Sequence, residues 1–412
     1  MVNLMKFWAP IFHIYQPPTQ DYEILKKINE ECYIPFLNVI KNSPNAKITL
    51  NINGVLIELL KKYDMENTIN LICELVNQGK VEIMGTAMYH PILPLIPEKE
   101  AIRQITLNEE INEMIFKDNW KHEGFFPPEL AISENVLKII TYEGYQWVLT
   151  PGISCTEEWP IDQIYQTEDH LYIFFRDDII SNEIAFNKIE AEEFVKKIDT
   201  VFEDKAQDYY IVTATDGETF GHHYKNYEKL FLEKTFKLIE QNPNIKIVFV
   251  SELINYFPIT KITHPLASSW STTLADLKLN IPYPLWKHPN NPIHRVQSRM
   301  FKNLDELIHI CDEVAARKPD NKEFLKKYET TRFFYDKSLY SCQMWWANIR
   351  VSWDPILIIK GSNLMLQAAL ESQLALLELN ILEGETPFEQ FIENYYKLLQ
   401  EIVRETQNIK NI

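Results

Sequence analysis

Residues 209–250 read YYIVTATDGETFGHHYKNYEKLFLEKTFKLIEQNPNIKIVFV. The first six residues are aromatic, apolar or β-branched and predict a buried strand, whereas residues 225–241 have the spacing of an amphipathic helix. A second apolar run, at 246–250, predicts the next strand. A strand, a helix and a further strand in succession are typical of a parallel sheet or a β/α barrel.

The same alternation covers the first 250 residues. Further strands are predicted at 4–9, 47–52, 80–84, 122–126, 146–150 and 171–175, and helical patterns at 98–116, 131–142 and 190–203. Seven or eight such units fit a barrel better than an open six-stranded sheet. We therefore expect an α/β fold with a β/α barrel at residues 1–265.

The pattern changes after about residue 258. The connector that follows is rich in Pro, His and Trp, and its residues 282–292, PYPLWKHPNNP, predict irregular chain. Helical patterns follow at 300–316, 321–338, 359–382 and 386–408. The predicted second domain, residues 266–412, is therefore a connector followed by a C-terminal helical bundle.

The composition is that of a folded protein, with 46% hydrophobic and 24% charged residues. Acidic residues outnumber basic ones 58 to 41, and no Lys/Arg cluster offers a footprint for nucleic acid. We expect no nucleic-acid partner, no membrane span and a soluble, cytoplasmic protein. The five cysteines lack any C-x-x-C spacing, which predicts reduced structural thiols and no zinc ribbon.

The chemistry is expected where the predicted strands end, because reactive groups of a β/α barrel lie on the loops after its strands. Residues 215–223 hold two glycines, two carboxylates (Asp216 and Glu218) and two imidazoles (His222 and His223), although the whole chain has only ten glycines. The alternative is a turn with a helix cap, where Asp and Gly are common.

A second carboxylate, Glu129, follows the strand at 122–126. Pro127 and Pro128 fix the backbone before it, and its neighbours are apolar. Such a carboxyl is either desolvated, with a shifted pKa, or simply the first-turn acid of the next helix. The surroundings of Glu129 do not decide between the two.

Other strand ends carry polar side chains too. His13, Tyr15 and Gln16 lie after the first strand, while Glu82 lies in the strand at 80–84 and is soon followed by His90. Paired carboxylates near aromatic residues suit glycosidic bond cleavage, which needs one protonated and one ionised acid. For each histidine the alternative is a structural role. Three tryptophans could stack on sugar rings or pack in the core: Trp270, Trp345 and Trp346.

Four stretches, in order along the chain, resemble the motifs of glycoside hydrolase family 57. They are His13-Ile14-Tyr15-Gln16-Pro17, Gly79-Lys80-Val81-Glu82-Ile83 with Tyr89-His90-Pro91, Phe126-Pro127-Pro128-Glu129-Leu130-Ala131, and Asp216-Gly217-Glu218-Thr219-Phe220-Gly221. Tyr15 replaces the second His of the family's His-x-His-Gln-Pro. Ser268-Ser269-Trp270-Ser271 resembles a region of the α-amylase and amylopullulanase branch.

The resemblance implies an incomplete (β/α)7 barrel, a C-terminal helical domain that contributes to the cleft, a retaining mechanism, and no catalytic metal or other cofactor. It implies that Glu129 is the nucleophile and Asp216 the acid/base, acting on an α-glucan or maltooligosaccharide. The expected substrate-binding residues are His13, Tyr15, Gln16, Glu82, His90, Glu218, His222, Trp270, Trp345 and Trp346.

Several alternatives stay open. Within the family, a 4-α-glucanotransferase or a branching-type transglycosylase would use the same residues. Outside it, a zinc-dependent deacetylase or α-mannosidase-like hydrolase would share a related barrel, and a glycan-binding protein could use the same scaffold without catalysis. The sequence makes no prediction about the oligomeric state.

Overall fold

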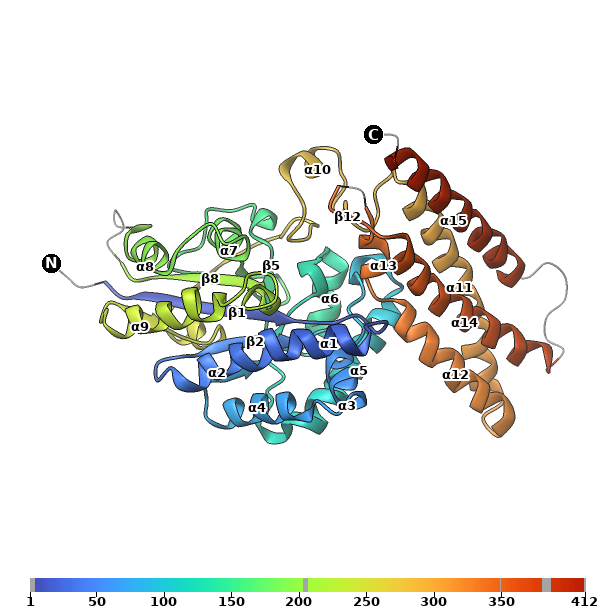
Figure 1. Ribbon diagram of the computed structural model, residues 1–412, viewed down its shortest axis with the longest axis horizontal. Coiled ribbons are helices and arrows are strands. Elements are labelled where there is room, and N and C mark those ends of the chain that lie inside the picture. The colour runs from blue at the N-terminus through green and yellow to red at the C-terminus, as the bar shows by residue number, and fades with distance from the viewer. Residues whose placement is uncertain (1–3, 203–206, 349, 380–386, 411–412) are drawn as a thin grey trace. The chain divides into compact units, whose positions relative to one another are not determined.

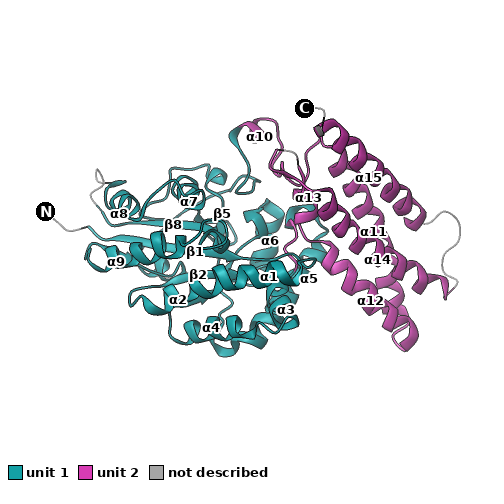
Figure 2. Cartoon of the chain, in the orientation of Figure 1, with its two compact units in different colours: residues 1–88, 93–274 teal, residues 89–92, 275–412 magenta. Residues whose placement is uncertain are grey.

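The computed structural model describes residues 4–202, 207–348, 350–379 and 387–410. The chain forms two compact units, drawn in different colours in Figure 2. Unit 1 comprises Met1–Met88 and Leu93–Leu274, and unit 2 comprises Tyr89–Ile92 and Ala275–Ile412.

A five-stranded parallel sheet lies at the centre of unit 1 in Figure 1, and its outer face packs against helices. Strand β1 pairs with β8 on one edge and with β2 and β9 on the other, and β3 continues the sheet beyond β2. The strands are β1 (Lys6–Ile14), β2 (Ile48–Ile52), β3 (Val81–Ile83), β8 (Tyr209–Asp216) and β9 (Ile245–Ile247).

The second sheet of unit 1 continues the barrel beyond β3. Its strands are β4 (Gly124–Phe125), β5 (Trp147–Thr150), β6 (Ile164–Gln166), β7 (Tyr172–Phe175) and β10 (Ile259–Ile262). A parallel bridge between Gly85 and Phe125 joins β3 to β4, and the Asp177 N–H donates to the Val212 carbonyl of β8.

Seven strands thus follow one another around the ring, in the order β1, β2, β3, β4, β5, β7 and β8. Within the described residues, no ladder pairs β7 with β8, so the barrel is incomplete there. The predicted incomplete (β/α)7 barrel is confirmed.

All eight strands predicted from the sequence are present, whereas β6 and β10 were missed. The helices of unit 1 are α1 (Tyr22–Ile28), α2 (Ile34–Asn42), α3 (Gly54–Lys62), α4 (Glu66–Asn77), α5 (Glu98–Phe116), α6 (Glu134–Tyr142), α7 (Asp178–Ala185), α8 (Ala191–Thr200) and α9 (Lys234–Glu240), which continues a π-helical turn at Glu228–Glu233. The prediction at 98–116 matches α5, and residue 203 of the helix expected at 190–203 lies outside the described residues.

The alternation of side chains along the strands directs polar residues to the mouth of the barrel. In β1, Phe7, Ala9 and Ile11 lie in the barrel core, whereas Trp8 and Phe12 pack outward against helices. Because side chains two residues apart share a face, His13 continues the inner row. By the same rule, Asp216 continues the inner row of Tyr210, Val212 and Ala214 in β8.

Unit 2 is built from four long helices, as predicted. They are α11 (Pro292–Arg317), α12 (Lys322–Ser338), α14 (Pro355–Leu377) and α15 (Pro387–Lys410), with the short helices α10 (Leu274–Lys278) and α13 (Cys342–Trp345) and a hairpin of β11 (Ala347–Asn348) and β12 (Ser352–Trp353). The ends of two predicted helices, at 380–382 and at 386, lie outside the described residues.

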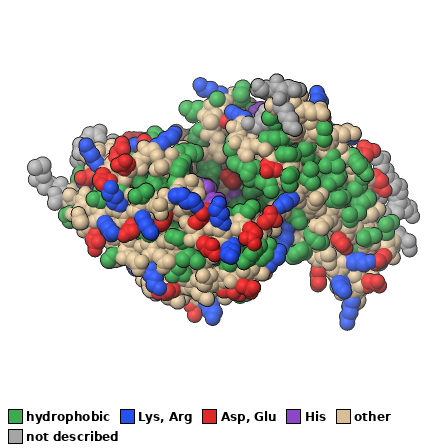
Figure 3. Space-filling view, in the orientation of Figure 1, with side chains coloured by type: hydrophobic (Ala, Val, Ile, Leu, Met, Phe, Trp, Pro, Cys, Tyr) green, Lys and Arg blue, Asp and Glu red, His purple; other side chains and the backbone are tan. Residues whose placement is uncertain are grey.

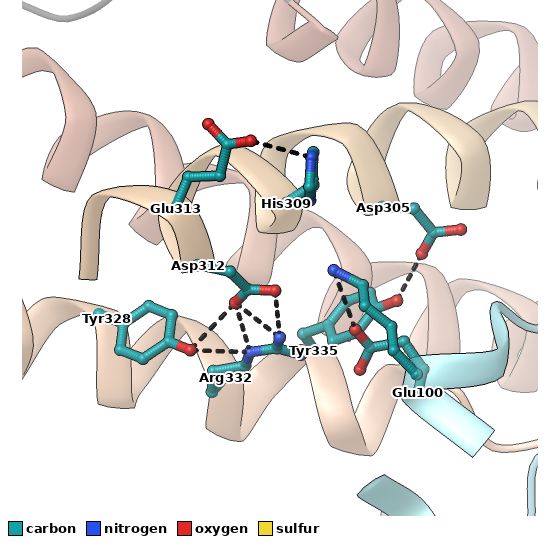
Figure 4. Close-up of polar contacts among 9 residues, drawn as sticks. Glu100, Asp305, His309, Asp312, Glu313, Tyr328, Arg332 and Tyr335 are labelled. Atoms are coloured by element: carbon teal, nitrogen blue, oxygen red, sulfur yellow. Dashed lines mark hydrogen bonds and ion pairs between the residues drawn. The ribbon is translucent and has the colours of Figure 1, made fainter. Parts of the chain in front are cut away.

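A polar cluster links α11 and α12 (Figure 4). The Arg332 guanidinium donates to both carboxylate oxygens of Asp312, and the Tyr328 hydroxyl donates to one of them at 3.0 Å. Bidentate geometry of this kind is among the stronger side-chain interactions. It fixes the register of these two helices.

The predicted domain boundary, after residue 265, falls before the observed one, after residue 274. Residues 266–274 belong with the barrel because Ile132 and Ser268 form a backbone bridge and the Trp270 N–H donates to the Glu129 carbonyl. Acidic and basic side chains are interspersed over the face of unit 1 drawn in Figure 3. None of the described helices is long and apolar enough to cross a membrane.

Candidate active site

Three polar side chains lie side by side at the mouth of the barrel. The strand register pairs His13 of β1 with Asn51 of β2 on one side and with Asp216 of β8 on the other. His13 Nδ1 hydrogen-bonds Asn51 Oδ1, and the imidazole stacks on Phe126 with the ring centroids 5.1 Å apart. Burial lowers the pKa of His13, partly offset by the negative charge of Asp216. A neutral imidazole that donates from Nδ1 to Asn51 fits this environment.

Glu129 lies in a strained turn. After the short strand β4, the backbone enters a single 3-10 turn in which Glu129 has φ 59° and ψ 17°, and Leu130 has φ 47°. Left-handed residues other than glycine cost ~1–3 kcal/mol each and persist only where the surroundings fix them. Here the surroundings are the buried Leu130 side chain in the barrel core and the backbone bridge from Ile132 to Ser268.

The Glu129 carboxyl is bound by Trp270. The indole Nε1–H donates to Oε2 at 2.7 Å, and the Trp270 backbone N–H donates to the Glu129 carbonyl at 3.1 Å. Burial and the nearby charge of Asp216 raise the pKa of Glu129 to about 8, against the lowering effect of the Trp270 N–H. The negative charge of Asp216 therefore acts on Glu129, which is largely protonated at neutral pH in the free protein.

Glu218 anchors the loop after β1. Its Oε1 accepts hydrogen bonds from the Tyr15 backbone N–H at 3.3 Å, from Gln16 Nε2 at 3.2 Å and from the Tyr33 hydroxyl. Burial and the charge of Asp216 raise the pKa of Glu218 to about 7. The predicted residues Tyr15, Gln16 and Glu218 are thus brought together beside Asp216.

Two other predicted substrate-binding residues of unit 1, Glu82 and His222, contact polar side chains of the same chain. Glu82 pairs with Thr49 in the sheet and accepts hydrogen bonds from Thr49 and Ser251. Because Thr49 lies two residues before Asn51 in β2, Glu82 lies deeper in the barrel than Asn51. Burial raises the pKa of Glu82 to about 7. His222 pairs with the carboxylate of Glu31. The substrate-binding roles of Glu82 and His222 stay predictions.

The remaining predicted residues belong to unit 2. His90 has a left-handed backbone (φ 57°), and its Nδ1 lies 2.9 Å from the Ser341 hydroxyl. Trp345 and Trp346 pack edge to face, with ring centroids 4.7 Å apart. Their contact with a substrate likewise stays a prediction.

Sequence reasoning missed Asn51 and Arg176 as candidate site residues. Asn51 is fully buried at the end of β2, and Arg176 is only 3% exposed. A signal existed for both: an Asn in an apolar strand and an Arg directly after Tyr-Ile-Phe-Phe are buried polar groups that need partners. Among the described residues, no three His, Cys, Asp or Glu side chains are grouped as ligands for a metal.

The fold of this chain is shared by several solved structures. Solved structures similar to this chain include an exo-type maltose-forming amylase from Pyrococcus sp. ST04, with a TM-score of 0.76 and 15% identity, covering 97% of this chain and 84% of that one. A branching enzyme from Pyrococcus horikoshii has a TM-score of 0.74 and 13% identity, covering 95% of this chain and 94% of the other. At these identities the likeness concerns the fold.

The chain belongs to glycosyl hydrolase family 57, whose sequence pattern matches residues 9–268. This confirms the resemblance found in the four motifs. The chain is also similar to the α-amylase of Pyrococcus horikoshii, at 29% identity over 287 residues, which are 65% of this chain and 44% of that protein. The chain therefore spans less than half the length of this curated relative.

Proposed function

We propose that this protein cleaves α-glucosidic bonds by a retaining mechanism, with Glu129 as nucleophile and Asp216 as acid/base. The observation that carries the proposal is the electrostatic coupling of these two carboxyls, one of which is bound by Trp270. A pair that holds one proton at neutral pH has what double displacement needs, namely one carboxylate and one carboxylic acid.

In the first step, Glu129 attacks the anomeric carbon while Asp216 gives its proton to the leaving oxygen. The proton that Glu129 holds in the free protein must therefore lie on Asp216 once the substrate is bound, which leaves Glu129 ionised. In the second step, Asp216 takes a proton from water, which attacks the glycosyl–Glu129 ester and releases a sugar of unchanged configuration. Retention requires the two carboxyls to be ~5–5.5 Å apart.

Neutral His13, held by Asn51 beside Asp216, would bind a sugar hydroxyl without adding charge to the pair. Glu218 would act by holding the loop that carries Tyr15 and Gln16. An α-glucan or maltooligosaccharide is the proposed substrate, as for the α-amylase relative. A cytoplasmic location is part of the proposal and suits the thiols of Cys32, Cys73, Cys155 and Cys311.

Glucan transfer is the second candidate, because a sugar hydroxyl can replace water in the second step, and one fold neighbour is a branching enzyme. Product analysis with maltoheptaose, starch and pullulan separates the two. Hydrolysis gives only shorter sugars with new reducing ends, whereas transfer gives longer or branched products without them. Binding of maltooligosaccharides with no new product from any of the three would contradict catalysis.

A further inference from the structure

Arg176 is a buried cation placed directly after β7, and its guanidinium is held from three directions. Nε donates to the Ala214 carbonyl at 2.8 Å, Nη1 donates to Asp178 at 2.7 Å, and Nη2 donates to Asn182 at 2.9 Å. The ion pair with Asp178 balances the charge of Arg176. What the guanidinium contributes to its surroundings is therefore chiefly a fixed position.

One consequence concerns the strand that carries Asp216. Ala214 lies two residues before Asp216 in β8, and its carbonyl accepts from Arg176 while its N–H donates to the Ser181 hydroxyl at 3.1 Å. On this side, β8 forms no ladder with β7 in the part of the chain that the structure describes. Arg176 and Ser181 thus hold the end of β8 where the barrel is incomplete.

The other consequence concerns Glu129. The guanidinium carbon lies 5.6 Å from the centre of the Trp270 ring, within the range of a cation–π contact. Edge-to-face contacts with Phe126, at 5.9 Å, and His13, at 6.1 Å, hold the same ring. The ring is therefore fixed while its N–H binds Oε2 of Glu129.

We propose that Arg176 is a positioning residue for both carboxyls, holding Asp216 through the Ala214 carbonyl and Glu129 through the Trp270 indole. Trp270 then serves as a fixed hydrogen-bond donor that orients the plane of the Glu129 carboxylate. This differs from the sugar-stacking role predicted from the sequence. The inference rests on the proposed roles of Glu129 and Asp216.

Trp270→Phe tests the indole N–H, because phenylalanine keeps an aromatic ring at the position and removes the donor. We expect kcat on maltoheptaose to fall ~10- to 100-fold with KM changed less than ~3-fold, the size expected for a hydrogen bond to a charged group. In the wild type, the hydrogen bond from Trp270 lowers the pKa of Glu129. Its removal should raise this pKa and move the alkaline limb of the pH–rate profile to higher pH. A raised KM with kcat and the limb unchanged would mean a stacking platform and would overturn the inference.

Arg176→Lys keeps the charge and loses the planar fork. We expect kcat to fall ~3- to 30-fold, as for loss of a buried cation–π contact, with a shift of the alkaline limb in the same direction. In the Trp270→Phe background, Arg176→Lys should have a smaller effect than in the wild type, because part of its action passes through the indole. If Arg176→Lys does not fold, Asn182→Ala removes the acceptor of Nη2 and should shift the alkaline limb in the same direction, and an unchanged limb would contradict the role of Arg176.

Trp147→Phe is the matched control. Trp147 is a buried tryptophan of the same barrel whose Nε1 has no hydrogen-bond partner in the described structure. Trp147→Phe should lower the free energy of unfolding and leave the alkaline limb of the pH–rate profile unchanged. Glu129→Gln distinguishes a failure of the proposed function from a failure of the role of Arg176. If this variant keeps wild-type turnover, the proposed function fails. If it is inactive while Trp270→Phe and Arg176→Lys keep the wild-type kcat and limb, only the role of Arg176 fails.

Discussion

The two carboxyls of the site are placed by different means. Asp216 ends an eight-residue strand that pairs in register with β1 along its whole length, and its backbone has an ordinary φ of −62°. Glu129 follows a two-residue strand and lies in a left-handed turn with φ 59°. The regular hydrogen bonding of the sheet places Asp216, whereas tertiary contacts impose a costly backbone on Glu129.

This contrast explains the use of both a strand end and a left-handed turn in the candidate site. A strand end places a side chain with little strain, but its direction is set by the sheet. The turn at Glu129 lets the carboxyl meet Trp270, which is 141 residues distant in the chain. Variants at the two positions test whether the positions also differ in chemistry and in stability.

The largest expected effect is the loss of turnover in Glu129→Ala and Asp216→Ala, by about 10⁴-fold or more on maltooligosaccharides. Azide with an α-glucosyl substrate that has a good leaving group distinguishes the roles. Asp216→Ala should give the α-glucosyl azide, because azide attacks an intact glycosyl–Glu129 intermediate. Glu129→Ala should give the β-glucosyl azide by direct displacement.

Glu74→Gln is the control for these variants, since Glu74 is a partly exposed carboxylate paired with Lys41, and it should keep wild-type turnover. The same azide anomer from both alanine variants, or the reverse assignment, would contradict the roles given to Glu129 and Asp216.

A smaller effect is expected from pH. Glu129, buried beside Asp216, keeps its proton below about pH 8 in the free protein. The reaction needs that proton, so kcat/KM should decline as pH rises through about 8. The folded protein also binds more protons here than the unfolded chain does. The free energy of unfolding should therefore fall between pH ~4.5 and ~8, less steeply in Glu129→Gln than in the wild type. Urea denaturation at several pH values gives the free energy of unfolding of both proteins. The same dependence of this free energy on pH in the wild type and in Glu129→Gln would show that Glu129 has an ordinary pKa.

The smallest effect concerns backbone strain. Glycine accepts a left-handed backbone freely, so Glu129→Gly should be more stable than Glu129→Ala by roughly 1 kcal/mol. At Asp216 the order should reverse, with glycine less stable than alanine by about 0.5–1 kcal/mol, because glycine loses more entropy there. Urea denaturation of the four variants gives both differences. The same order at both positions would contradict the contrast.

The same contrast explains what the sequence could predict. The strands of the barrel are buried on both faces and appear as short apolar runs, so eight of them were located. Helices α1–α4 and α7 were missed, although α6, α8 and α9, which are of similar length, were located. The first strand was predicted to end at residue 9, although β1 continues to Ile14, so His13 lies within the strand.

Within the candidate site, Asp216 was proposed from its own surroundings, a strong strand followed by a polar cluster. Glu129 was not, because nothing local shows that Glu129 and Leu130 adopt positive φ, and its role came from the family resemblance. The contacts of Trp270 with Glu129 and of Arg176 with Ala214 join distant parts of the chain. Periodicity and motif spacing carry no information about such contacts.

Trapping the covalent intermediate tests the central claim most directly. Asp216→Ala incubated with a fluorinated α-glucosyl fluoride, digested and measured by mass spectrometry should carry one glucosyl ester, located on Glu129. A label on another residue, or turnover with inverted configuration and no label, would contradict the account.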